Sequence, residues 1–427
     1  MRILLDPGTL DGLNAGDVAM LHAAVFRFRR LQPDVRIDVL TLVPDGLASY
    51  CPGVEPVPDE GRLAWLAEQA LFGQLRRRGP KPVGDSLAGA TRALRLRWPS
   101  AFRGLLHAKM RLRGTSREPL DRFLEALCGA DVVVIGGQAS LNDTFAARAG
   151  TVLSTLEAAM ALRKHTALVG QAIGPIRNPA LAARARTILP RVDVISLREE
   201  RTGRPLLEEF GVEPGRIEIT GDDALELSHG LAVGTRGSAI GVNVRVASYA
   251  GTQDIVLEHL REILVSASRR LGAPLLPIPI AFHEGARDVG ALQALLAGAS
   301  PEEDGGTTLR TPEAILAQVR RCRIVVTGAY HAAVFALGQG IPAVCLDASS
   351  YYHAKWNGLE DLFGEGCRVV SLAEPEWEVR LARTIDTAWV QADVVRDRLL
   401  AAAARQVDAG RAAYARIAAL PSRMVAA

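Results

Sequence analysis

The stretch I-V-V-T-G-A-Y-H-A-A-V-F-A-L-G-Q-G-I-P-A-V-C-L, residues 324–346, indicates the fold of this chain. Its β-branched opening, 324–326, is typical of a buried parallel strand. Residues 329–337 then predict a helix of small residues that is ended by glycines, and 343–346 predicts the next strand. The order strand, turn, helix, strand is the repeating unit of a doubly wound α/β sheet.

His331 and Tyr330 fall in the first turn of this predicted helix, and Lys355 follows the next strand. Backbone N–H groups at a helix N-terminus have no partner within the helix, so they stabilise an anion that lies beyond them. We therefore predict a pocket for a phosphate or a carboxylate. The alternative is a capping or partly buried His331 and a surface Lys355, and the sequence leaves it open.

Length, charge and cysteine usage narrow the class of protein. The chain has 427 residues, enough for two domains of roughly 100–200 residues each. Its net charge of +3 gives no argument for nucleic-acid binding. Five scattered cysteines without a C-x-x-C pair favour buried thiols in a reducing compartment, and neither a disulfide framework nor a zinc site. Without a signal peptide or a long apolar window, we expect a cytoplasmic protein.

The first predicted turn is a second candidate for ligand binding. A short strand over 2–5 is followed by D-P-G-T-L-D-G-L-N-A-G-D and by a helix-like pattern over 18–31. The turn lacks the glycine spacing of dinucleotide-binding and P-loop motifs. We expect Asn14 and Asp17 to present polar groups at the carboxyl edge of a parallel sheet. The alternative for Asp17 is a role limited to capping the helix.

Glycines or an arginine stand at the carboxyl ends of three further predicted strands. One predicted strand ends at Gly136 and Gly137, where the missing side chains would let a ligand approach the backbone. Arg198 follows a strand over 192–197, and Arg245 follows a strand that begins at 239. Because the carboxyl ends of parallel strands meet at one edge, we expect these positions to face a cleft.

The polar, glycine-rich segment 228–238 predicts a linker. We accordingly predict an N-terminal α/β domain over 1–230, a C-terminal α/β domain over 231–395 and a helical tail over 396–427. The predicted fold class is α/β, with two doubly wound, Rossmann-like domains facing each other across a cleft, as in GT-B enzymes.

A basic insertion occupies about 75–118 of the first domain. Residues 76–117 hold twelve Lys and Arg against one acid, Asp85, with Trp98 and several leucines interleaved. Three interpretations stay open: a solvated basic face, contact with an anionic membrane surface at the inner membrane face, or a surface for an anionic glycan or lipid-diphosphate acceptor. Nucleic acid is not favoured as a partner, because no reader motif accompanies the charge.

Seven motifs in order resemble the polysaccharide pyruvyl transferase family. They are N-A-G-D from Asn14, D-V-V-V-I-G-G from Asp131, G-Q-A-I-G-P from Gly170, I-S-L-R-E-E-R-T from Ile195, G-D-D-A from Gly221, I-G-V-N-V-R from Ile240 and T-G-A-Y-H-A-A-V-F-A-L-G-Q-G-I-P from Thr327. The resemblance implies a GT-B-like fold and transfer of pyruvate from phosphoenolpyruvate onto two hydroxyls of a saccharide acceptor. The product is a cyclic ketal, and phosphate is released.

The resemblance also implies roles for site residues. Arg198, His331 and Lys355 would hold the phosphate and carboxylate of phosphoenolpyruvate, with His331 also transferring a proton and Asp17 acting on an acceptor hydroxyl. Many family members carry an arginine two residues before the histidine, where this chain has Ala329. Arg245 or Arg198 would then have to substitute for it. No metal and no cofactor is expected, since the chain has no D-x-D run or metalloprotease motif.

Two other functions remain compatible with the motifs. One is a GT-B glycosyltransferase that uses a nucleotide-sugar. The other is a non-catalytic, glycan-binding member of the same family, and Ala329 favours it because the donor site would lack a cation.

Overall fold

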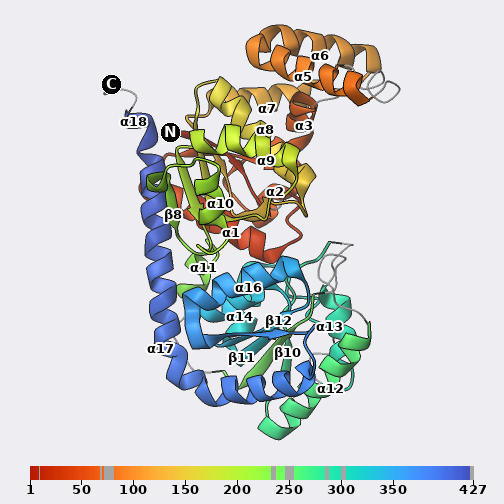
Figure 1. Cartoon of the computed structure of the whole chain (residues 1–427), viewed down its shortest axis with the longest axis vertical. Coiled ribbons are helices and arrows are strands. Elements are labelled where there is room, and N and C mark those ends of the chain that lie inside the picture. The colour runs from red at the N-terminus through yellow and green to blue at the C-terminus, as the bar shows by residue number, and fades with distance from the viewer. Residues whose placement is uncertain are drawn as a thin grey trace.

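The computed structural model describes residues 1–8, 10–67, 70–71, 81–231, 237–245, 254–283, 288–299 and 304–423. Over these ranges the chain forms two parallel sheets, each flanked by helices (Figure 1). The predicted fold class, two Rossmann-like α/β units, is confirmed. Among the described helices, none combines the length and apolar character needed to cross a bilayer.

The first sheet has the strand order β3-β2-β1-β4-β6-β7-β8, with β5 paired to β6. Its strands are β1 Arg2–Asp6, β2 Arg36–Thr41, β3 Glu55–Pro58, β4 Val132–Ile135, β5 Gln138–Leu141, β6 His165–Ile173, β7 Val194–Leu197 and β8 Ile217–Ile219. Leu5 of β1 is in register with Val39 on one side and Val134 on the other. Strand order reverses between β1 and β4, and open α/β sheets bind ligands at such a switch point.

The helices of this part are α1 Ala15–Leu31, α2 Leu47–Tyr50, α3 Asp59–Leu66, α5 Lys81–Arg97, α6 Pro99–Arg113, α7 Glu118–Gly129, α8 Ala146–Ala161, α9 Pro179–Ile188, α10 Gly203–Glu209 and α11 Leu225–His229. The basic insertion is thus helical over α5 and α6. Its first residues, 75–80, lie outside the described residues.

The second sheet has the order β10-β9-β11-β12-β13, so its switch point lies between β9 and β11. Its strands are β9 Ala239–Asn243, β10 Leu275–Pro277, β11 Cys322–Thr327, β12 Ala343–Asp347 and β13 Cys367–Ser371. Its helices are α12 Asp254–Leu271, α13 Asp288–Leu296, α14 Pro312–Arg320, α15 Tyr330–Gly338, α16 Ser350–Phe363, α17 Trp377–Ala418 and α18 Leu420–Arg423. The unit predicted from 324–346 is confirmed as β11, α15 and β12. Every residue of α15 is buried, which explains its small side chains.

The segment 228–238, predicted as a linker, overlaps helix α11 at its start. Ser228 lies in α11 and is fully buried, and a Cβ on Gly338 of α15 would lie 2.0 Å from its Oγ. Residues 232–236 lie outside the described part of the chain. The domain boundaries themselves stay a prediction.

Helix α17 connects both sheets. It begins at Trp377, before the predicted tail, and runs along one side of the molecule (Figure 1). Near its end, the Tyr414 hydroxyl donates to Asp223 Oδ2 at 2.8 Å. Arg27 of α1 pairs with the same carboxylate at 2.5 Å and with Glu226 of α11 at 2.8 Å. These buried contacts hold α1, α11 and α17 together.

Candidate active site

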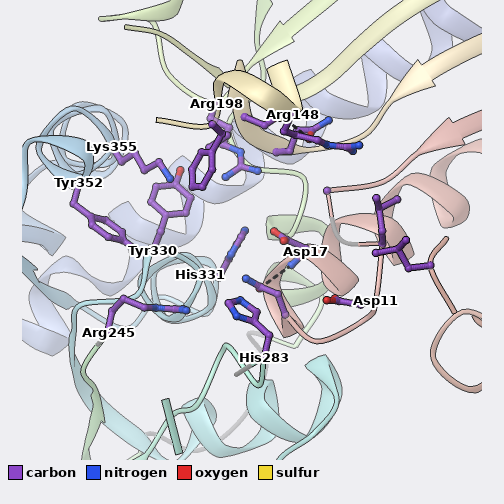
Figure 2. A pocket seen from close by; sticks show the side chains of 18 residues that line it. Asp11, Asp17, Arg148, Arg198, Arg245, His283, Tyr330, His331, Tyr352 and Lys355 are labelled. Carbon is purple, nitrogen blue, oxygen red and sulfur yellow. Dashed lines mark hydrogen bonds between the residues drawn. The ribbon is translucent and has the colours of Figure 1, made fainter. Parts of the chain in front are cut away.

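The two switch points face a common cleft of about 430 Å³ (Figure 2). Its walls come from both sheets, and positively charged side chains enter it from several elements. The lining residues are Gly8, Leu10, Asp11, Asn14, Asp17, Leu42, Gln138, Ala139, Ser140, Phe145, Arg148, Arg198, Arg245, His283, Tyr330, His331, Tyr352 and Lys355. The structure therefore brings Asn14, Asp17, Arg198, Arg245, Tyr330, His331 and Lys355 into one concavity.

Backbone hydrogen bonds join the two halves at the edge of this cleft. Asn14 forms an antiparallel bridge with Ala281. The Ala15 N–H donates to the Ile280 carbonyl at 2.9 Å, and the Phe282 N–H donates to the Leu13 carbonyl at 2.8 Å. The turn after β1 is thus attached to the second half, so residues of α1 can share a site with residues of α15.

Asn14 caps α1, and this leaves Asp17 available to the cleft. The Asn14 side chain accepts hydrogen bonds from the N–H groups of Gly16 and Asp17 at 3.0 and 3.2 Å. The alternative of Asp17 as the cap is therefore wrong. Burial raises the pKa of Asp17, while His331 and Arg198 oppose that rise. A carboxyl with a raised pKa can exchange a proton near neutral pH more readily than an ordinary one.

His331 lies in the first turn of α15, as predicted, and is 7% exposed. Its Nε2 is 3.6 Å from Oδ2 of Asp222. The Tyr330 ring meets the imidazole edge-on at a centroid distance of 5.6 Å. The histidine is therefore held between a carboxylate and an aromatic ring, with one edge on the cleft (Figure 2).

Asp222 also anchors Arg198. The Arg198 Nε is 3.0 Å from Asp222 Oδ2, and it donates to the Gly170 carbonyl at 2.7 Å. Burial alone would raise the pKa of Asp222, but Arg198 and His331 outweigh it and lower that pKa to about 2. One ionised carboxylate thus orients both a guanidinium and an imidazole at the cleft.

Two more cations complete the wall formed by the second half. Lys355 of α16 lies over the rings of Tyr330 and Tyr352, with Nζ 5.9 and 5.5 Å from their centroids. Burial and the nearby Arg198 lower the pKa of Lys355 well below its usual range. Arg245, which follows β9, lies 3.4 Å from Asp288 through its Nε. An anion in the cleft would offset the repulsion between these cations.

Arg148 of α8 also lines the cleft, although it was not predicted from the sequence. Its guanidinium donates to Asp6 Oδ1 at 2.5 Å and to the Pro7 carbonyl at 3.2 Å. The other oxygen of Asp6 accepts from Arg62 at 2.6 Å. No motif surrounds Arg148, so only the packing of α8 against the end of β1 reveals it. Asp222 could have been found, because it belongs to the G-D-D-A motif.

Gly136 and Gly137 do not line the cleft. A Cβ on Gly137 would lie 2.4 Å from the sulfur of Met20, so the missing side chain makes room for α1. A role of these glycines in ligand binding stays a prediction. Within the described ranges, no group of three or more His, Cys, Asp or Glu side chains is arranged to hold a metal ion.

Gly16→Ala is expected to lower both the stability of the fold and the activity that this cleft supports. A Cβ at position 16 would lie 2.0 Å from His331 Cγ and Nδ1, so the imidazole must move. Misplacing a reacting group by about 1 Å can cost roughly 100-fold in rate. Turnover and thermal unfolding should be measured together. Gly290→Ala is the matched control, because its Cβ would meet nothing within 4 Å. An unchanged rate in Gly16→Ala would contradict this packing.

Comparisons with solved structures concern the fold alone. Among solved structures, a protein from Listeria monocytogenes provisionally described as a UDP-N-acetylglucosamine 2-epimerase superposes with a TM-score of 0.55 at 13% identity, covering 100% of this chain and 97% of the other. UDP-GlcNAc 2-epimerase from Neisseria meningitidis gives 0.49 at 12% identity, with 100% of both chains covered. A glycosyltransferase from Rickettsia africae gives 0.49 at 11% identity, covering 99% and 98%.

At these identities the likeness concerns the fold. No curated protein matches the sequence. The model of the family described as polysaccharide pyruvyl transferase, however, matches residues 14–350, a range that holds most of the residues that line the cleft. The chain therefore belongs to the polysaccharide pyruvyl transferase family.

Proposed function

We propose that this protein moves the pyruvyl group of phosphoenolpyruvate onto two hydroxyls of a saccharide, as a ketal. The observation that carries the proposal is the convergence of Arg198, Arg245, Lys355 and His331 on one cleft. Phosphoenolpyruvate bears a phosphate and a carboxylate on the same carbon, and guanidinium and ammonium groups are the partners that such anions prefer.

The proposed reaction begins with proton transfer to the methylene carbon of phosphoenolpyruvate. This leaves an oxocarbenium-like carbon, which a sugar hydroxyl attacks as it loses its proton. The C–O bond to phosphate then breaks, and the second hydroxyl closes the ketal. Of the two hydroxyl protons, one balances the proton gained by the methyl group, and the other leaves with phosphate. The scheme needs no cofactor, because every electron pair moves within donor and acceptor.

In this scheme His331 protonates the donor and contacts its phosphate, while Arg198 and Lys355 hold the anionic groups. Asp17 lines the same cleft from α1, next to Gly16, which packs against His331, and there it can accept a proton from the sugar (Figure 2). Its raised pKa suits that role.

Arg245 is our candidate for the cation that Ala329 does not supply. A Cβ on Gly328 would lie 3.1 Å from the Arg245 backbone nitrogen, so Arg245 lies beside the turn that carries Ala329. Its side chain is nearly buried and lines the cleft. This placement supports donor binding and disfavours a family member that has lost its donor site.

Phosphoenolpyruvate is expected to raise the stability of the protein in a thermal-shift experiment. A ligand that binds only the folded state adds about 2.7 kcal/mol at 100 times its Kd. Inorganic phosphate and pyruvate serve as single-anion controls and should give smaller shifts. A shift with nucleoside diphosphates alone would instead support a nucleotide-sugar glycosyltransferase. Glycan binding without any effect of phosphoenolpyruvate would support a non-catalytic protein.

A further inference from the structure

Helices α5 and α6 form a hairpin at one end of the molecule, beyond the helices that cover the first sheet (Figure 1). We call residues 86–117 of this segment the basic hairpin. It adds no strand to the sheet and no residue to the cleft described above. The fold and the cleft therefore do not explain why the basic hairpin carries so many basic and exposed apolar side chains.

The inner face of the basic hairpin is firmly attached. Phe102 and Leu106 of α6 are buried, and the Phe102 ring meets Trp65 of α3 edge-on at 5.0 Å. Arg95 of α5 is also buried and donates to the carbonyls of Trp65 and Leu66 at 3.1 and 2.9 Å. The orientation of the outer face is consequently defined by the body of the protein.

The outer face of α6 carries an apolar stripe that no described residue covers. The stripe consists of Trp98, Ala101, Leu105, Ala108 and Leu112, all exposed. They are spaced three and four residues apart, which places them on one side of a helix. Trp98 is 58% exposed, Leu105 49% and Leu112 88%. A solvated basic face has no physical need for these large side chains.

Positive charge flanks the stripe without compensating acids. Arg97, Arg111, Arg113 and Arg117 form no ion pair among the described residues. The other arginines of the hairpin differ, since Arg92 pairs with Glu157 and Arg103 with Asp121. The Arg97 guanidinium lies over the Trp98 ring at 5.4 Å. Arg97, Arg111 and Arg113, which have no ion-pair partner among the described residues, are thus next in sequence to Trp98 and Leu112 of the stripe.

We propose that the outer face of the basic hairpin binds the surface of an anionic phospholipid bilayer. Tryptophan and leucine insert at the boundary between headgroups and acyl chains, while flanking arginines bind the negative headgroups. A soluble polyanion would use the arginines but would leave the apolar stripe in water. Of the interpretations left open by the sequence, a solvated basic face and an anionic glycan use the arginines alone, whereas a membrane surface uses both features. This inference does not depend on the proposed reaction.

The test is cosedimentation of the whole protein with vesicles of phosphatidylcholine mixed with phosphatidylglycerol. We expect binding that weakens with salt and that is lost on vesicles of phosphatidylcholine alone. Arg111→Gln with Arg113→Gln should reduce binding roughly 25-fold, at about five-fold for each charge. Leu105→Ser with Leu112→Ser should reduce it at least roughly ten-fold without changing the net charge.

Matched controls use exposed residues of α17. Val390→Ser with Val394→Ser replaces side chains that are 73% and 65% exposed, and Arg383→Gln with Arg405→Gln removes two exposed charges. Both controls should bind vesicles like the unmodified protein. Binding that depends on the arginines but not on the leucines would overturn the proposal and would indicate a polyanion, which a soluble anionic polysaccharide would then displace. Equal loss in the α17 controls would also overturn it.

Discussion

Replacing His331 with alanine is expected to reduce phosphate release from phosphoenolpyruvate and acceptor by roughly 1,000-fold or more. General acid catalysis by a positioned side chain contributes roughly 10²–10⁴-fold, and the variant also loses a contact to the departing phosphate. His331 would supply both the proton and the phosphate contact. Its Nε2 lies 3.6 Å from Asp222 Oδ2, and its side chain lines the cleft. The measurement is steady-state phosphate release.

A second measurement separates catalysis from binding in this variant. Arg198, Arg245 and Lys355 remain in the cleft, so phosphoenolpyruvate should still stabilise His331→Ala against thermal unfolding. His259→Ala is the matched control, because His259 is an exposed histidine of α12 that pairs with Glu378 at 3.2 Å. Near-normal turnover in His331→Ala would refute the role assigned to this histidine, whatever the control shows.

Asp222→Asn is expected to lower both activity and stability. The substitution leaves Arg198 buried without its carboxylate, and breaking a buried ion pair in this way costs about 3–5 kcal/mol. It also removes the carboxylate that lies 3.6 Å from His331 Nε2 and helps to position the imidazole. We expect turnover to fall roughly 100-fold, because a reacting group misplaced by about 1 Å can cost that much in rate.

The loss of stability expected in Asp222→Asn should depend on pH. The folded-state pKa of Asp222 is about 2, below the ordinary value of 3.8. The ionised carboxylate therefore stabilises the folded protein fully above the ordinary pKa, and this stabilisation is lost as the pH falls through about 2. That contribution is about 2 kcal/mol, because each tenfold change in an acid dissociation constant corresponds to about 1.36 kcal/mol. The difference in unfolding free energy between the unmodified protein and Asp222→Asn should therefore shrink on acidification.

Asp361→Asn provides the comparison for a surface carboxylate. Asp361 pairs with Arg201 at 2.6 Å, but both side chains are about half exposed, so its loss should change stability by less than about 1 kcal/mol. If Asp222→Asn behaves like Asp361→Asn in both stability and turnover, Asp222 does not organise the site.

The local units of this protein and their order could be predicted from its sequence. Periodicity and glycine placement predicted β11, α15 and β12, because a buried strand and a small-residue helix have distinct patterns over a few residues. The rule that parallel strands end at one edge then placed Arg198, Arg245 and His331 on a common cleft. These inferences need only neighbouring residues and the handedness of the connections.

How distant elements meet could be learned only from the folded chain. Asp222 lies beside His331, Arg148 enters the cleft from α8, and Gly16 leaves room for the imidazole. Each of these contacts joins elements whose spacing depends on how α1, α8 and α15 pack. Periodicity shows which face of a helix is buried, but it does not show which residue of a second element, more than 100 positions away, lies against that face.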